Sequence, residues 1–336
     1  MSMGMPTNVN SFTDEKNKNV DIFIYSHVPF VPVVENPVYK ILTNNHAPDE
    51  EFQRFPNEYM EIPMPRPTAE TIDGDFFLKV PVPNPNGHRN LPIYRDYTGD
   101  NISENNLMFN EYAGFYWLLH NWDIKDYIGM VHYRRYFNFL DEVPNIEKIF
   151  SYGIKVILNS KFYLRYPMGS SIPKSNREFY KIWHNVDDFD LMGKIVKENY
   201  PQYADGWDKM ANVDYIYPSS LFIMPKELFK EYVSFAIDVM NKFNDARGCH
   251  TPEEWIAYVE AHKDEYVRPQ HAYYTVKMQA RATGYLVERC LAAFLMAGDD
   301  PLVNHAAEYE WSVLGEKSWK RPKPKIEPSA NTKTNI

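Results

Sequence analysis

Cysteine is nearly absent from this sequence. Only Cys249 and Cys290 occur among 336 residues, and their spacing matches no metal-binding or redox motif. Disulfide frameworks and structural zinc sites both need several cysteines at regular spacing. The sequence therefore predicts neither of them, and it fits a reducing compartment such as the cytoplasm.

Long hydrophobic runs are also missing. A membrane-spanning helix needs about 18 consecutive apolar residues, and no stretch of the chain approaches that length. The first residues lack the basic and apolar segments of a secretory signal. We therefore expect a soluble cytoplasmic protein, whose contact with a membrane, if any, is peripheral and at the inner face.

Positive charge is in short supply. The chain has 36 Lys and Arg residues against 45 Asp and Glu residues, a formal net charge of −9. Nucleic-acid binding depends on many basic side chains that neutralise phosphates, so this balance argues against a nucleic-acid partner. A phosphate-bearing ligand must therefore meet a local group of basic residues. The aromatic content of 15% suits both a packed core and the stacking of sugars or bases.

The folded part of the chain is expected between two polar ends. We predict a disordered segment at 1–19, one domain at 20–314 and a flexible Lys- and Pro-rich tail at 315–336. Apolar runs predict strands, and apolar residues at helical spacing predict helices. The strands are expected at 21–27, 76–82, 127–132, 153–158 and 215–224, and the helices at 104–121, 226–243, 270–282 and 285–296, with two more starting at capping boxes after 175 and 251. Strands that alternate with helices predict an α/β fold, a sheet flanked by helices.

The most unusual string is HYRRYF at 132–137, directly after the predicted strand at 127–132. A strand end that presents His132, Arg134 and Arg135 would place two guanidinium groups where they can hold a diphosphate and stabilise it as a leaving group. The alternative is a pair of surface arginines that form ion pairs with nearby carboxylates.

A second polar string, TGDNISENN at 98–106, leads into the predicted helix at 104–121. The first backbone N–H groups of a helix are unpaired and favour anions, so Asp100, Asn101 and Ser103 are candidates for shaping a donor pocket. The alternative is a simple helix cap, in which these side chains bind their own loop.

These strings occur together with others that make a broad resemblance. The chain resembles a family of bacterial capsule and O-antigen enzymes, the domain-of-unknown-function family 4422. The resemblance runs from about residue 21 to 297 and rests on SHVPF at 26–30, YTGDNISE at 97–104, Glu111, YW at 116–117, DYIGMVHYRRYF at 126–137, LFIMPK at 221–226 and GYLVER at 284–289. It implies a GT-A-like nucleotide-diphospho-sugar transferase fold. It also implies transfer of a hexose, galactofuranose as first choice, from a UDP-sugar to a saccharide in capsule, O-antigen or exopolysaccharide synthesis.

One departure from the wider GT-A pattern concerns the metal ion. Metal-dependent relatives carry Asp-x-Asp after the strand that here ends in His132-Tyr-Arg134. Two guanidinium groups can neutralise a departing UDP as a divalent cation would, so we expect transfer that requires no cofactor, with Mn²⁺ or Mg²⁺ as the alternative. Asp-x-Asp spacings at 73–75 and 188–190 fall in a Pro-rich loop and at a helix start, where acidic residues commonly serve the helix dipole.

The transfer also needs a base for the acceptor hydroxyl. Glu288, in the GYLVER string, is the first candidate, and Asp187 and Asp190 are further candidates; Glu288 beside Arg289 is also typical of a solvated ion pair. His184 is a candidate for binding the acceptor. His27, at the end of the first strand, is a candidate for binding the donor, and a structural role is its alternative.

The expected partners are a UDP-sugar and a saccharide or lipid-linked saccharide. The basic tail at 317–325 favours a peripheral membrane contact with anionic lipid, although a solubilising tail has the same composition. Two other functions stay open at this point. One is a non-catalytic protein that binds nucleotide sugars or glycans, and the other is a phosphate-handling hydrolase built around the same arginine pair.

Overall fold

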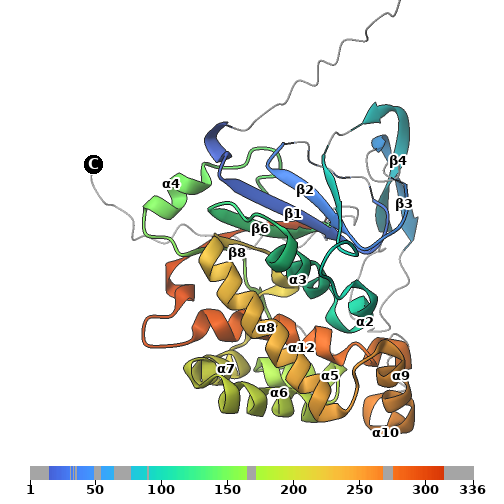
Figure 1. The fold of residues 1–336 in the computed structure, drawn as a ribbon, viewed down its shortest axis with the longest axis vertical. Coiled ribbons are helices and arrows are strands. Elements are labelled where there is room, and N and C mark those ends of the chain that lie inside the picture. The colour runs from blue at the N-terminus through green and yellow to red at the C-terminus, as the bar shows by residue number, and fades with distance from the viewer. Residues whose placement is uncertain are drawn as a thin grey trace, which may run out of the picture.

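A mixed β-sheet carries the fold (Figure 1). The computed structural model describes residues 15–30, 32, 34, 36–48, 54–63, 77–88, 91–164, 172–267 and 275–313. The main sheet has the order β12 (Ala306–Tyr309), β8 (Val156–Asn159), β11 (Phe222–Pro225), β6 (Tyr127–His132), β1 (Val20–Ser26), β2 (Tyr39–Thr43) and β5 (Ile93–Arg95). Beyond this path, β7 (Arg135–Phe137) pairs with β6 and with β13 (Trp311–Val313).

Strand direction decides which residues meet at the sheet edge. Strands β6, β1, β2 and β5 run parallel, so their carboxyl ends lie at one edge. Strand β11 is antiparallel to β6, so its beginning lies at the same edge. The register places Tyr25 opposite His132 and Phe222 opposite Met130. The residues just before β11 therefore lie beside the end of β6.

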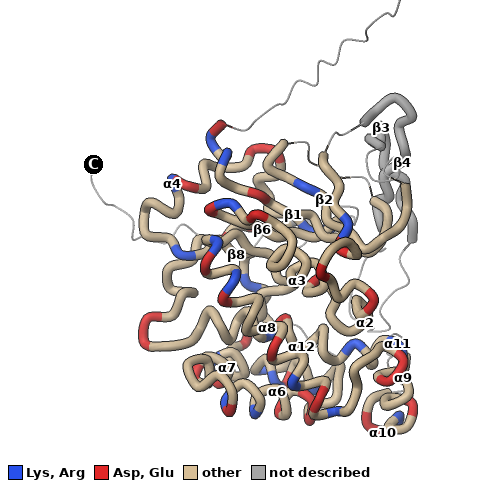
Figure 2. The backbone as a smooth tube through the Cα atoms, in the orientation of Figure 1, with Lys and Arg blue, Asp and Glu red and all other residues tan. Residues whose placement is uncertain are grey.

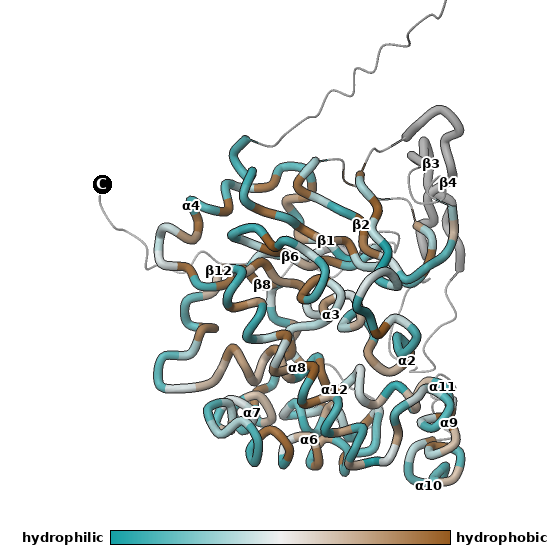
Figure 3. Tube along the Cα trace, in the orientation of Figure 1, coloured by the Kyte–Doolittle hydropathy of each residue, from teal (hydrophilic) through white to brown (hydrophobic). Residues whose placement is uncertain are grey.

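Alternation along the strands divides the apolar residues between two cores. On β1, Phe23 and Tyr25 join the core under the helices, whereas Ile22 and Ile24 join the core on the opposite face. Hydrophobic segments run through β1, β8 and α12 (Ala282–Met296) in Figure 3. The sheet is therefore buried on both faces.

Helices cover one face of the sheet in two layers (Figure 1). The layer against the sheet contains α3 (Tyr112–Asn121), α8 (Lys226–Arg247) and α12, and further helices pack below it, namely α5 (Asn176–Trp183), α6 (Val186–Asn199), α7 (Ala204–Asn212), α9 (Pro252–Ala261), α10 (Lys263–Tyr266) and α11 (Val276–Gln279). Acidic and basic residues are both spread along the outer helix α6 (Figure 2). The opposite face of the sheet is covered by loops and by α4 (Ile146–Ser151). Within the described part of the chain, no helix is both long and apolar enough to cross a bilayer.

Two small antiparallel ribbons stand apart from the main sheet. One pairs β3 (Arg54–Pro63) with β4 (Phe77–His88), where the sequence predicts only the strand at 76–82. The other pairs β9 (Phe162–Tyr163) with β10 (Tyr215–Ile216).

Capping residues fix where two helices begin, as the sequence predicts. The Ser175 hydroxyl accepts a hydrogen bond from the Glu178 N–H at the start of α5. Thr251 and Glu254 form a reciprocal capping box at the start of α9, with Pro252 at the first helical position. Each pair satisfies backbone donors that the helix itself leaves free.

Two elements that the sequence predicts as continuous are broken in the structure. The predicted helix at 104–121 is divided into η2 (Ser103–Asn105), α2 (Asn106–Phe109) and α3, because Asn110 takes a φ of 49°. The predicted strand at 215–224 is divided into β10, the turn η4 (Pro218–Ser220) and β11, because Ser219 and Ser220 take φ values of 68° and 47°. The helix predicted at 270–282 is present only as α11, and residues 268–274 lie outside the described residues; α12 begins at Ala282, before the predicted start at 285.

The predicted polar ends of the chain are only partly described. Residues 15–17 form the short turn η1 (Glu15–Asn17), and buried Asn17 accepts a hydrogen bond from the Ile146 N–H. Residues 15–19 are thus attached to the domain, although the sequence predicts disorder for them. Residues 1–14 and the tail at 314–336 lie outside the described residues.

The contact between α7 and α12 leads to a prediction about stability. A Cβ atom at Gly206 would lie 2.1 Å from the carbonyl oxygen of Ala293 and 2.9 Å from the backbone nitrogen of Ala297. Because backbone must move to make room, Gly206→Ala is expected to destabilise the protein by about 1–3 kcal/mol or more. Urea unfolding measures this change. Asp208→Ala, on the exposed side of the same helix, is the control and should change stability by less than about 1 kcal/mol; equal effects would contradict the packing described.

Candidate functional site

Titratable side chains from four elements gather at the carboxyl edge of the sheet. His132 ends β6, Arg134 follows in the turn, and Arg135 begins β7. Glu111 occupies the break between α2 and α3, and Arg281 is the residue before α12. We call these five residues the edge cluster.

Glu111 is the buried carboxylate of the edge cluster. Its exposed fraction is 6%, and its Oε1 has no hydrogen-bond partner among the described residues. Burial, and then the negative charge of Glu288, raise the pKa of Glu111 from its ordinary value of 4.5 to about 7, against the opposing effect of Arg281 and Arg135. A carboxylate that titrates near neutral pH is suited to accepting and returning a proton.

His132 lies beside this carboxylate and stays uncharged. Its Nε2 is 3.9 Å from Glu111 Oε1, which is an ion-pair distance but too long for a hydrogen bond. Burial, and then the positive charge of Arg135, lower the pKa of His132 to about 3. A neutral imidazole at this position adds no further positive charge next to the arginines.

The three arginines have no carboxylate partner within ion-pair distance in the described part of the chain. Arg134 lies over the Tyr133 ring, 4.9 Å from the ring centre, and Arg281 donates from Nε to Asn110 Oδ1 at 3.1 Å. All three are half-buried. Partly desolvated guanidinium groups without a counter-ion favour an anionic ligand, since a phosphate group can accept from both arms of each fork.

Strained backbone surrounds the edge cluster. Asn110, Ser219 and Ser220 are three of the four non-glycine residues with positive φ that the structure describes, and each such residue costs about 1–3 kcal/mol. The surroundings hold Asn110 in place, because Arg281 binds its side chain and a Cβ atom at Gly284 would lie 2.1 Å from its Nδ2. Strain concentrated at one place is typical of functional sites.

Hydrogen bonds of the Tyr112 hydroxyl connect the strained segments. Its hydroxyl is bonded to the Tyr232 hydroxyl on α8, lies 3.2 Å from the Ser220 hydroxyl, and donates to the Val287 carbonyl on α12 at 3.3 Å. The residue next to Glu111 therefore joins three elements through one buried oxygen, which fixes the position of the carboxylate.

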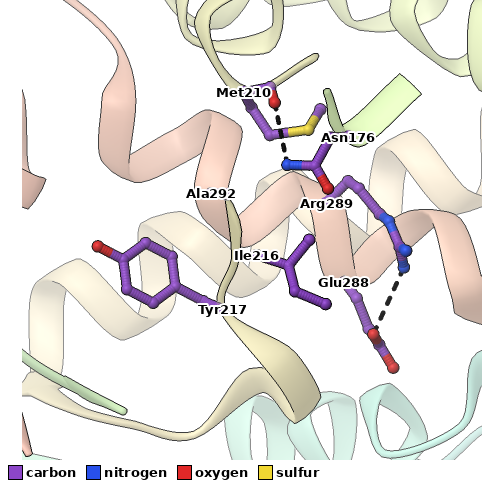
Figure 4. A pocket seen from close by; sticks show the side chains of 7 residues that line it. All are labelled: Asn176, Met210, Ile216, Tyr217, Glu288, Arg289 and Ala292. Atoms are coloured by element: carbon purple, nitrogen blue, oxygen red, sulfur yellow. Dashed lines mark hydrogen bonds and ion pairs between the residues drawn. The ribbon is translucent and has the colours of Figure 1, made fainter. Parts of the chain in front are cut away.

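Glu288, the first candidate for the base, lies on α12 near Glu111. Its side chain is 28% exposed, and its Oε2 is 3.4 Å from Arg289 Nη1. Figure 4 shows this ion pair beside a cavity of about 10 Å³, with the Glu288 carboxylate at the opposite end of the view from Met210 and Asn176. The cavity has room for about one water molecule, so it is no sugar site.

His27 lies close to the arginines and keeps access to solvent. Partial desolvation, and then the charges of Arg281 and Arg134, lower the pKa of His27. The ring packs edge-on against Tyr133 at 5.6 Å. Of the sequence-predicted donor residues, His27, His132, Arg134 and Arg135 thus come together, and their donor role stays a prediction.

Asp100 and Asn101, two other predicted donor residues, are bound by α3 and by their own loop. Asp100 Oδ1 accepts from the Tyr116 hydroxyl at 3.0 Å, and Asn101 Nδ2 donates to the Gly99 carbonyl. The backbone N–H of Asp100 also donates to Asn121, at the far end of α3. Asn121 is ten residues beyond Glu111, a distance of about 15 Å along the helix.

Ser103 binds a buried carboxylate, that of Asp96. Its hydroxyl donates to Asp96 Oδ1 at 2.5 Å, and Tyr25 donates to the other oxygen of the same carboxylate. Burial raises the pKa of Asp96, while these two hydrogen bonds lower it. Ser103 therefore anchors the loop to Asp96, directly after β5.

The predicted acidic candidates on α6 lie away from the edge cluster. Asp187 and Asp190 are exposed, and Asp190 accepts two hydrogen bonds from Arg177. Between them Asp188 is buried, and burial raises its pKa to about 6 although Arg247 and the Tyr266 hydroxyl bind it. A surface hollow of about 530 Å³ beside Asp190 is lined by residues of α5, α6 and α7.

His184 lies one layer behind the site. It is buried, its ring stacks on Tyr285 at 4.4 Å, and its Nδ1 is 3.3 Å from Gln279 Oε1. Tyr285 in turn carries a buried hydroxyl without a partner among the described residues, and its pKa is raised by burial. A contact between His184 and an acceptor stays a prediction.

The side chains around β6 do not fit a divalent cation. Among the described residues, no three His, Cys, Asp or Glu side chains gather where they could hold a metal ion. His132 and Arg134 stand at the end of β6, followed by Arg135, and the two guanidinium groups would repel a cation. Transfer without a cofactor stays a prediction. The two Asp-x-Asp spacings of the sequence do not lie at the end of β6. Asp73 and Asp75 fall outside the described residues, and Asp188 and Asp190 bind arginines.

One protein-family model matches most of the chain. Residues 67–299, more than two thirds of the 336 residues, match a domain of unknown function, DUF4422. The chain belongs to the DUF4422 family. This DUF4422 chain has no match among curated proteins.

A solved structure shares the fold of the DUF4422 chain. The apo structure of WbbM, a bifunctional glycosyltransferase, superposes with a TM-score of 0.54 at 18% sequence identity, and the match covers 88% of this chain and 45% of that one. The chain thus spans less than half the length of WbbM. The prediction of an α/β, GT-A-like fold is confirmed.

Sequence reasoning missed Glu111 and Arg281 as site residues. Glu111 belongs to the strings behind the family resemblance, yet the predicted continuous helix gives it no special position. Arg281 stands three residues before the GYLVER string, and no local motif marks it. Both reach the site only because of the break at Asn110 and the packing of α12 against it.

The raised pKa of Glu111 leads to a prediction about stability and pH. The folded protein holds this proton more tightly than the unfolded chain, so the stabilisation is complete below about pH 4.5 and is lost as the pH rises through about 7. Between pH 5 and pH 7.5 the wild type should lose roughly 2 kcal/mol relative to Glu111→Gln. Urea unfolding of both proteins at the two pH values measures the difference. A difference that does not change with pH would contradict the burial of an unpaired carboxylate.

Proposed function

We propose that the protein is a glycosyltransferase that moves a hexose, with galactofuranose as first choice, from a UDP-sugar to a saccharide acceptor. The observation that carries the proposal is the set of three half-buried arginines without carboxylate partners at the carboxyl edge of a GT-A-like sheet. Ligands of open α/β sheets bind at this edge.

The arginines suit the diphosphate of the donor. Arg134 and Arg135 follow β6, and Arg281 approaches from α12, so a bound diphosphate would meet positive charge from two elements. When the bond from the sugar to the diphosphate breaks, negative charge grows on the departing UDP. Guanidinium groups fixed in advance stabilise that charge without a metal ion.

Glu288 is the favoured base for the acceptor. Its side chain is 28% exposed, against 7% for the side chain of Glu111, so Glu288 is the more accessible of the two to an acceptor. In the proposed step the acceptor oxygen forms a bond to the anomeric carbon and gives its proton to Glu288. The bond from that carbon to UDP breaks, and UDP leaves with the electron pair.

The proposed biological setting rests on the family resemblance. Synthesis of capsule, O-antigen or exopolysaccharide at the inner face of the cell membrane fits a UDP-sugar donor and a lipid-linked acceptor. The basic tail at 317–325 would contact anionic lipid. A non-catalytic protein that binds the same donor would keep the arginines but would not need the base.

Ligand binding tests the arginine site. A UDP-hexose should raise the melting temperature of the wild type in the presence of a chelator, because a ligand that binds the folded state stabilises it. Arg134→Ala should abolish the shift, and Arg281→Ala should weaken it. Thermal unfolding with a panel of nucleotide sugars measures both.

Arg177→Ala is the matched control for this measurement. Arg177 is a surface arginine bound to Asp190, and its removal should leave the ligand-induced shift unchanged. If no nucleotide sugar stabilises the wild type, or if Arg134→Ala keeps the full shift, the proposed donor site is wrong.

Turnover tests the role of Glu288. Glu288→Gln should lower kcat by about 10²–10⁴-fold while donor binding persists, because general base catalysis contributes a factor of that size. UDP release with a panel of octyl glycosides as acceptors measures the rate. Wild-type protein that binds UDP-sugars but never releases UDP would favour the non-catalytic alternative.

A further inference from the structure

The surroundings of Glu111 only partly replace the water that an ionised carboxylate would lose on burial. One of its oxygens has no hydrogen-bond partner among the described residues, and the nearest imidazole nitrogen, on His132, is 3.9 Å away. An ionised carboxylate with an unpaired buried oxygen is costly unless nearby positive charge offsets the loss of water.

The groups that face Glu111 come from every element around it. A backbone hydrogen bond, and then the charges of Arg281 and Arg135, favour its ionised form, and Glu288 opposes it. The remaining titratable neighbours are uncharged at neutral pH, and they are Tyr25 on β1, Tyr112 on α3, His132 on β6 and Tyr232 on α8. Of the charged groups around Glu111, the two arginines are therefore the ones that favour its ionised form.

A bound diphosphate changes this balance. Its negative charge would offset Arg135 and Arg281, which are the positive charges that favour ionised Glu111. Burial and the charge of Glu288 would remain, and both favour the protonated form of Glu111. Ligand binding and protonation at Glu111 must then be linked, and each must strengthen the other.

We infer that Glu111 takes up a proton from solvent when the donor diphosphate binds the arginines, and that this leaves Glu288 as the charged carboxylate of the site. The inference rests on the proposed function and deepens it. Two interacting carboxylates titrate as a pair. Once Glu111 is protonated, its negative charge no longer opposes the ionisation of Glu288, so Glu288 stays ionised. Glu111 is then a positioning residue that sets the charge of the base, and it does not touch the acceptor.

Calorimetric titration with UDP tests the inference. At pH 7.5 the terminal phosphate of UDP is already ionised, since its pKa is about 6, so proton uptake must come from the protein. Titration in two buffers with different ionisation enthalpies gives the number of protons exchanged. We expect uptake of roughly half a proton or more, and a UDP affinity that falls roughly five- to tenfold between pH 7 and pH 8.5.

Three variants identify the group that binds the proton. Glu111→Gln should bind UDP without proton uptake and without this dependence on pH. Glu288→Gln should move the uptake to lower pH, because it removes the charge that favours protonation of Glu111. Glu227→Gln, at an 80% exposed side chain on α8, is the control and should behave as the wild type.

The outcomes separate this inference from the proposed function. If wild-type protein binds UDP with no proton uptake, the inference is wrong and the donor site stands. If uptake persists unchanged in Glu111→Gln, the proton binds elsewhere, with His27 as the nearest solvent-exposed candidate, and the inference is again wrong. If UDP does not bind at all, both fail.

Discussion

The fixed position of one buried carboxylate, Glu111, constrains the rest of the site. Removing a carboxylate from water requires compensating charge, and here Arg135 and Arg281 supply it from two different elements. Because these arginines have no carboxylate within ion-pair distance among the described residues, they also remain able to bind an anion. The same charges therefore stabilise the buried carboxylate and, in the proposed function, bind the diphosphate of the donor.

The irregular backbone follows from that requirement. Glu111 can face the sheet edge only because the chain turns at Asn110, and Arg281 and Gly284 of the neighbouring segment hold that turn. Ser219 and Ser220 complete the surroundings from the beginning of β11, where Tyr112 meets Ser220. Three strained residues persist because buried hydrogen bonds and close packing over-determine their conformation.

Much of the sheet and of its helical cover could be predicted from the sequence. The strands β1, β6 and β8 are short apolar runs, and capping boxes mark α5 and α9, so local signals identify them. The HYRRYF string could be placed at a strand end for the same reason. These features depend on neighbours in the sequence.

The missed features depend on contacts between distant segments. Apolar spacing continues through Asn110 and through 215–224, so periodicity alone predicts an unbroken helix and an unbroken strand. The breaks arise from the packing of α12 and α8 against α3, which residues 104–121 do not encode by themselves. A local pattern also does not tell whether the polar side chains of Asp100 and Asn101 bind a ligand or the protein. In the structure they bind the Tyr116 hydroxyl on α3 and the Gly99 carbonyl.

The central claim is that the arginines at the end of β6 and before α12 hold the diphosphate of a nucleotide. A structure of the protein with UDP bound tests it most directly. The account predicts diphosphate oxygens within hydrogen-bonding distance of the guanidinium groups of Arg134, Arg135 and Arg281. Diphosphate bound elsewhere, for example in the hollow between α6 and α7, with these three arginines free, would contradict it.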